Sequence, residues 1–229
     1  MRYCQEARSP WGDLPGEGSP LVFVHGHHSV AAGLRPLALF LQTHTGRPSW
    51  AMSWTDHRSP LEDHALRMSQ QLLERLDRLE NSPPITLIAH SRGGLVAALF
   101  CARWAQQHHI QIKELITLGT PWWGTKWAAV GQKIGYPGSA PLELARESDL
   151  LATLRAWATS KESPRICCIA SPNDQLILPA SAALLPEKEH LVLSGTGHVG
   201  LLFDERAMHQ VLSWVRASDS LAAPRVPLL

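Results

Sequence analysis

The chain has 229 residues, of which 45% are hydrophobic and 18% are charged. This composition is typical of one compact globular domain and excludes a disordered or fibrous protein. The 21 Lys and Arg residues nearly balance the 20 Asp and Glu residues, so the formal net charge is +1. No excess of positive charge indicates a nucleic-acid partner or attraction to anionic lipid.

The cysteines and the hydrophobic runs bear on the cellular environment. Cys4, Cys101 and the adjacent pair Cys167 and Cys168 lack the spacing of a secreted disulfide framework, which favours reduced thiols. The first ten residues contain no apolar stretch of the kind that a signal peptide needs, and no later run reaches membrane-spanning length. We therefore expect a cytoplasmic protein with no membrane span.

Short apolar runs alternate with helical patterns along most of the chain. The expected strands are a run that begins at Pro20, then 48–54, 85–90, 112–118, 165–170 and 191–194. The expected helices cover about 31–42, the stretch between Ala65 and Leu79, a segment that begins near 92, and about 205–216, with Asp204 as the cap of the last helix. This alternation predicts an α/β fold with a doubly wound, mostly parallel sheet, formed by a single domain over residues 1–229.

Residues 121–161 interrupt the alternation. The segment lies between two expected strands, is too long for a plain crossover, and contains several Trp, Gly and Pro residues. We expect a helical insertion that forms a cap or small lid.

A chemically distinctive stretch joins the third expected strand to the helix after it. The strand ends in Ala89-His90-Ser91-Arg92-Gly93-Gly94, which places small residues two positions before and two positions after a serine. A sharp strand-to-helix turn of this kind exposes the serine hydroxyl and leaves room only for small residues at those two positions. Ser91 is thus a candidate nucleophile, although a serine at this place can also serve only as a helix cap.

These residues give the chain a resemblance to the α/β-hydrolase superfamily, particularly its lipase and esterase branch. Two further motifs contribute: His25-Gly26 after the first strand, and Leu118-Gly119-Thr120-Pro121-Trp122-Trp123-Gly124-Thr125 after the fourth. The first small position of the turn is Ala89 in place of the commoner glycine, as in some lipases.

The resemblance implies a catalytic acid after the penultimate strand and a histidine after the last. Asp174 and His198 occupy these places in the chain order Ser, Asp, His, and Asp149, Glu143 and Glu147 are alternative acids. The carboxyl ends of parallel strands meet at one edge of a sheet, so the three groups are expected to converge there. His198 would accept the proton of Ser91, and Asp174 would hold the required tautomer.

The resemblance also implies an oxyanion hole, formed by the backbone N–H groups of His27 and Arg92. Four tryptophans are candidate walls of the substrate pocket, with core packing as the alternative: Trp54, Trp122, Trp123 and Trp127. His25, His27 and His28 form a cluster without matching ligands, so we expect no metal and no cofactor.

The expected function is hydrolysis of a small-molecule or lipid-like carboxylic ester with an apolar acyl group. Such a substrate is compatible with transient contact of the protein with a lipid surface. The same triad would serve a thioesterase or an amidase, and a non-catalytic hydrolase-fold binding protein is a third alternative. The oligomeric state is not indicated by the sequence.

Overall fold

The structure is a computed structural model that describes residues 13–79 and 82–222. Cys4 and the rest of the N-terminal segment used to predict localisation therefore lie outside the described residues. No helix in the described part of the chain combines the length and the apolar character needed to cross a lipid bilayer.

Six strands in the described residues form one sheet in the order β2-β1-β3-β4-β5-β6, and every neighbouring pair is parallel. The strands are β1 (Leu21–Val24), β2 (Ser49–Met52), β3 (Ile85–His90), β4 (Ile112–Leu118), β5 (Arg165–Ala170) and β6 (Glu189–Val192). Their parallel register brings the ends of β3, β4 and β5 together, with His90 opposite Leu118 and Leu118 opposite Ile169. Loops that follow these strands therefore gather at one edge of the sheet.

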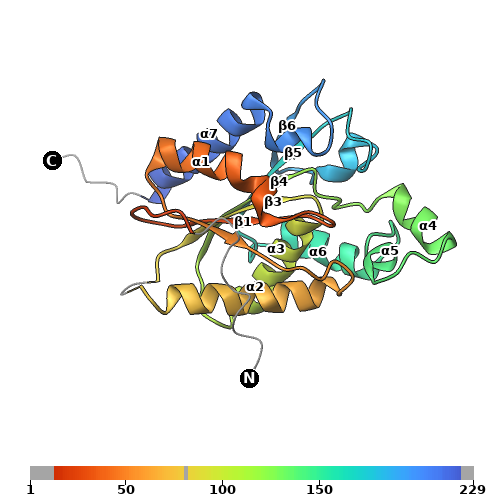
Figure 1. Cartoon of the computed structure of the whole chain (residues 1–229), viewed down its shortest axis with the longest axis horizontal. Coiled ribbons are helices and arrows are strands. Elements are labelled where there is room, and N and C mark those ends of the chain that lie inside the picture. Colours follow the sequence, from red (N-terminus) through yellow and green to blue (C-terminus); the bar gives the residue numbers. More distant parts are fainter. Residues whose placement is uncertain (1–12, 80–81, 223–229) are drawn as a thin grey trace.

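Helices cover both faces of the sheet, which confirms the predicted doubly wound α/β fold (Figure 1). On one face lie α1 and α7, and on the other lie α2, α3 and α6. The helices are α1 (Arg35–Thr45), α2 (Leu61–Leu76), α3 (Arg92–Phe100, continued by a π-helical turn over Cys101–Ala105), α4 (Lys126–Lys133), α5 (Ala140–Glu143), α6 (Asp149–Thr159) and α7 (Glu205–Ala222), with short 3₁₀ turns at Ala31–Leu34, Ala180–Ala183 and Gly200–Leu202.

The sheet separates two layers of hydrophobic core, as the alternation of side chains in β1 shows. Leu21 and Phe23 pack on the side of α1 and α7, whereas Val22 and Val24 pack on the side of α2, α3 and α6. All four are fully buried, as expected of a strand covered on both faces.

The predicted insertion divides into two parts. Leu151 and Leu154 of α6 are buried in the core, so this helix is the crossover between β4 and β5. By contrast, α4 and α5 extend from the edge where the strands end (Figure 1). We call residues 126–144, which contain α4 and α5, the cap segment.

Candidate active site

Ser91 lies in a sharp turn between β3 and α3. Its φ of 55° and ψ of −133° place a non-glycine residue in a strained region of backbone space. The backbone N–H of Ser91 donates to the carbonyl of Leu118, and the Oγ1 hydroxyl of Thr120 donates to the carbonyl of Ser91. Neighbouring strand-end residues thus hold the turn in this conformation.

Glycines provide the space that this turn requires. A Cβ added at Gly93 would lie 2.4 Å from the carbonyl oxygen of His25, and one added at Gly94 would lie 2.0 Å from Thr120 Oγ1. At Gly26, an added Cβ would lie 2.8 Å from the Cβ of Ser91. The segment around His25 and Gly26 and the segment around Ser91 and Gly93 therefore pack closely against each other.

Asp174 and His198 form a buried hydrogen-bonded pair. The Nδ1–H of His198 donates to Asp174 Oδ2 at 2.6 Å, and both residues are less than 10% exposed. The other carboxylate oxygen of Asp174 accepts the backbone N–H groups of Leu176 and Ile177, each at 2.8 Å. The carboxylate is fixed by three donors and orients the imidazole so that its Nε2 is free.

The loops that carry this pair are joined by two further hydrogen bonds. Ser171 Oγ donates to the carbonyl of Thr196, and the N–H of Gly195 donates to the Asn173 side-chain oxygen. Gly119, with a φ of 60°, leaves room for the imidazole, because an added Cβ would lie 3.1 Å from His198 Nδ1.

His90, the residue before Ser91, contacts His198. Its Nε2 is 3.0 Å from the carbonyl oxygen of His198, and the centroids of the two rings are 4.6 Å apart. Burial, together with the neighbouring His198, lowers the pKa of His90 to about 3, so this ring is neutral at physiological pH. This contact between His90 and His198 is not predicted from the sequence, where the position of His90 next to Ser91 is the one signal for it.

Ser91 and His198 line one cleft of about 910 Å³. The hydrogen bond of the His198 ring in the described residues goes to Asp174 and not to Ser91 Oγ. His27 and Arg92 line the same cleft. Arg92 is the first residue of α3, and the first backbone N–H groups of a helix have no carbonyl acceptor within that helix.

The four tryptophans lie in different surroundings. Trp127 lines the cleft, and its indole N–H donates to the carbonyl of Gln175. Trp122 is fully buried in the core. Trp54 lies between a tilted His25 ring and a stacked His64 ring, with centroid distances of 4.4 Å and 4.8 Å. We therefore correct the expectation for Trp122 and Trp54, since neither contributes to the cleft lining.

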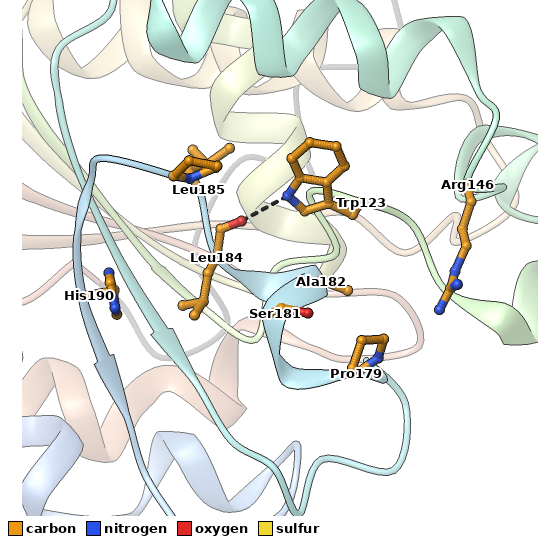
Figure 2. Close-up of a pocket in the computed structure, with 9 residues that line it drawn as sticks. Trp123, Arg146, Pro179, Ser181, Ala182, Leu184, Leu185 and His190 are labelled. Atoms are coloured by element: carbon orange, nitrogen blue, oxygen red, sulfur yellow. Dashed lines mark hydrogen bonds between the residues drawn. The ribbon is translucent and has the colours of Figure 1, made fainter.

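Trp123 contributes to a different cavity of about 590 Å³, near the 3₁₀ turn over Ala180–Ala183 (Figure 2). Its indole N–H donates to the carbonyl of Leu184, and the guanidinium of Arg155 lies 4.3 Å from the centre of its ring. Trp123 is thus also outside the cleft that holds Ser91. A loop that follows a strand end does not by itself specify which way each side chain points.

The remaining cleft lining is largely apolar. Much of it comes from the cap segment and from the loops that carry Asp174 and His198: Val130, Ile134, Pro141, Leu144, Leu176, Ile177, Val199, Leu202 and Phe203. In the described residues, no group of three or more His, Cys, Asp or Glu side chains is arranged to hold a metal ion. The site can accommodate an apolar group beside a serine hydroxyl.

This combination of sheet order, strained serine turn and buried Asp-His pair defines an α/β-hydrolase fold. A family model described as "Domain of unknown function (DUF7379)" matches residues 4–132, more than half of the chain. The chain therefore belongs to this family.

Solved structures share the fold at low sequence identity. The mature lipase BlEst2 of Bacillus licheniformis matches with a TM-score of 0.68 at 14% identity, over 90% of this chain and 94% of its own. Est1E of Butyrivibrio proteoclasticus matches with a TM-score of 0.65 at 15% identity, over 90% of each chain. Phospholipase PlaB of Legionella pneumophila matches with a TM-score of 0.72 at 15% identity, over 87% of this chain and 58% of its own.

A curated relative is similar in sequence over part of the chain. It is the lecithin-cholesterol acyltransferase-like 1 protein of Arabidopsis thaliana, which is 30% identical over 116 residues. The similarity covers 46% of this chain and 26% of that protein, so the chain spans about a quarter of the relative's length.

Proposed function

We propose that this protein is a serine hydrolase that cleaves carboxylic esters with an apolar acyl group. The observation that carries the proposal is a strained serine and a buried Asp-His pair at one apolar cleft. The lipases and the phospholipase among its structural neighbours, and its acyltransferase-like relative, agree with ester chemistry.

In the proposed reaction, Ser91 Oγ attacks the carbonyl carbon of the ester while its proton passes to His198 Nε2. Asp174 accepts from Nδ1 and stabilises the imidazolium that forms. The N–H groups of His27 and Arg92 would donate to the oxyanion of the tetrahedral intermediate.

Collapse of that intermediate breaks the bond to the alcohol, which leaves with the proton from His198. Water then attacks the acyl group on Ser91, again with His198 as the base, and releases the carboxylic acid. Trp127 and the aliphatic residues around it would bind the acyl chain.

The proposal is tested with a series of nitrophenyl esters of increasing acyl length. We expect Ser91→Ala to lower turnover on the order of a thousandfold or more, with little change in folding. Ser69→Ala is a matched control, since it removes a buried hydroxyl in α2 that has no hydrogen-bond partner among the described atoms. Equal turnover in both variants would refute the assignment of Ser91.

The bond that is cleaved is a separate question, because a thioester or an amide could use the same groups. Matched thioester and anilide substrates of one acyl length distinguish these cases. We expect the oxygen ester to have the highest kcat/KM, and a clear preference for the thioester or anilide would replace esterase by thioesterase or amidase.

A further inference from the structure

The side chain of Arg92 carries a buried ion pair that the reaction above does not use. Its guanidinium donates to Glu143 Oε2 at 2.8 Å, and the two side chains are 3% and 13% exposed. The same guanidinium contacts His64 Nδ1 at 2.9 Å and donates to the carbonyl of Ser59 at 2.8 Å. A charge removed from water to this extent needs such partners, because breaking a buried pair leaves an uncompensated charge.

Glu143 belongs to α5, so the pair joins the cap segment to the turn that holds Ser91. The second oxygen of Glu143 accepts the backbone N–H of Leu61 at 2.7 Å, which adds the start of α2 to the junction. The backbones approach closely at this point, since a Cβ added at Gly138 would lie 2.8 Å from the carbonyl oxygen of Arg58. Three separate segments of the chain meet around one guanidinium.

The position of α4 depends on α5. The amide of Gln132 in α4 donates to the carbonyl of Pro141 at 2.7 Å, and an added Cβ at Gly131 would lie 3.2 Å from Pro141 Cγ. At the other end of α4, Thr125 Oγ1 donates to the carbonyl of Leu176. The first turn of α4 is thus fixed to the loop after β5, and its last turn is supported by α5.

This helix forms a wall of the cleft. Trp127, Val130 and Ile134 line it and are 47%, 44% and 71% exposed, which leaves apolar surface available to a ligand. An acyl chain that extends from Ser91 would gain contacts with these residues in proportion to its length. A short acetyl group would not reach as far along the wall.

We propose that Glu143 is a positioning residue for acyl-chain recognition: through Arg92 it holds the cap segment on the serine turn and thereby sets the preference for long acyl groups. The proposal rests on the proposed esterase function. The cap segment is then a fixed wall whose attachment determines KM for long substrates.

The test compares Glu143→Gln with Glu62→Gln. Glu62 forms an ion pair with Arg103 in which both side chains are about half exposed, so the same chemical change there breaks a solvated pair. We expect Glu143→Gln to lower the ratio of kcat/KM for a long-chain ester to kcat/KM for the acetyl ester by about tenfold, mainly through KM. Glu62→Gln should leave this ratio unchanged.

The conservative variant Glu143→Asp retains the charge and should recover part of the long-chain preference. If Glu143→Gln does not fold, Glu143→Asp is compared with Glu62→Gln in its place. Equal ratios in the Glu143 variants and in Glu62→Gln, or a loss in kcat that is the same for all acyl lengths, would overturn the proposal.

Hydrogen exchange separates this proposal from the proposed function. Amides of residues 126–144 should exchange faster in Glu143→Gln than in Glu62→Gln, whether or not any ester is hydrolysed. If the wild type cleaves no ester but the exchange difference is present, the proposed function fails, whereas the attachment of the cap segment through Glu143 stands. Identical exchange in both variants would show that Glu143 does not hold the cap segment.

Discussion

Ser91 adopts a backbone conformation that is costly for a residue with a side chain, and the packing around it compensates for this cost. The turn is recognisable in the sequence because steric limits select small residues at fixed positions, here Ala89 and Gly93. Asp174 and His198 are recognisable because each follows an apolar strand in the expected order. Residue type and position relative to strand ends are therefore enough to nominate these three groups.

Residue type and position relative to strand ends do not predict how a side chain within a loop is oriented. Trp122, Trp123 and Trp127 are near neighbours in the chain, yet they lie in the core, in a second cavity and in the cleft respectively. The ion pair of Arg92 is likewise not predictable from the sequence, because its partner Glu143 is distant in the chain. Such contacts depend on tertiary packing that no local pattern specifies.

Asp174→Asn tests the hydrogen-bonded pair directly. An asparagine amide can place its NH₂ group toward Nδ1 of His198 and would favour the tautomer with the proton on Nε2, which cannot accept from Ser91. If the proposed triad is correct, we expect turnover to fall by about ten-thousandfold, the effect of this substitution in Ser-His-Asp proteases.

Asp204→Asn provides the matched control, because Asp204 caps α7 and pairs with Arg206 at the surface. Its turnover should stay close to that of the wild type. A loss of less than tenfold in Asp174→Asn would argue for a different acid.

Among the secondary-structure elements, buried strands were the most predictable. The bounds of β3, β4 and β5 agree with the prediction, because their apolar side chains are required on both faces of the sheet. The edge strand β6 begins at Glu189, two residues earlier than predicted, since its first residues are exposed and polar. The last helix, capped by Asp204 as predicted, continues to Ala222, beyond the expected end near residue 216.

The contact between α3 and β1 gives a prediction at the level of elements. Gly93→Ala would place a methyl group 2.4 Å and 2.5 Å from the carbonyl oxygens of His25 and Val24, which belong to rigid backbone. We expect the free energy of unfolding to fall by at least about 3 kcal/mol in urea denaturation.

Gly33→Ala is the matched control, because its added Cβ would only come within 3.6 Å of Ser29 Oγ. Its stability should change by less than about 1 kcal/mol. Similar stability of the two variants would contradict the close packing of the serine turn on β1.

At the scale of the whole molecule, several histidines link folding to pH. Burial lowers the pKa of His25, His27 and His64 from 6.5 to about 4, with neighbouring positive charges as further causes. His64 accepts from Arg92 through Nδ1 and its Nε2–H donates to the carbonyl of Asp56, an arrangement that requires the neutral ring. The folded state therefore binds these protons less readily than the unfolded chain.

Between pH 6.5 and about 4 the unfolded chain carries more protons on these three histidines than the folded protein does. Their contribution to the free energy of unfolding is therefore fully present above pH 6.5 and decreases as the pH falls toward 4. We expect the free energy of unfolding from urea titrations to be lower at pH 5 than at pH 7. His64→Gln should reduce this difference, because it removes one of the contributing groups. Equal stability of the wild type at the two pH values would contradict the burial of these histidines.

In the proposed mechanism, Ser91 is a nucleophile whose proton passes to His198, and Asp174 orients that histidine. The most direct measurement is reaction of the wild type and Ser91→Ala with a fluorophosphonate, followed by mass spectrometry of the labelled peptides. We expect one phosphonyl group on Ser91 in the wild type, no specific label in the variant, and parallel loss of ester turnover. A label on another serine, together with full turnover by Ser91→Ala, would show that Ser91 is not the nucleophile.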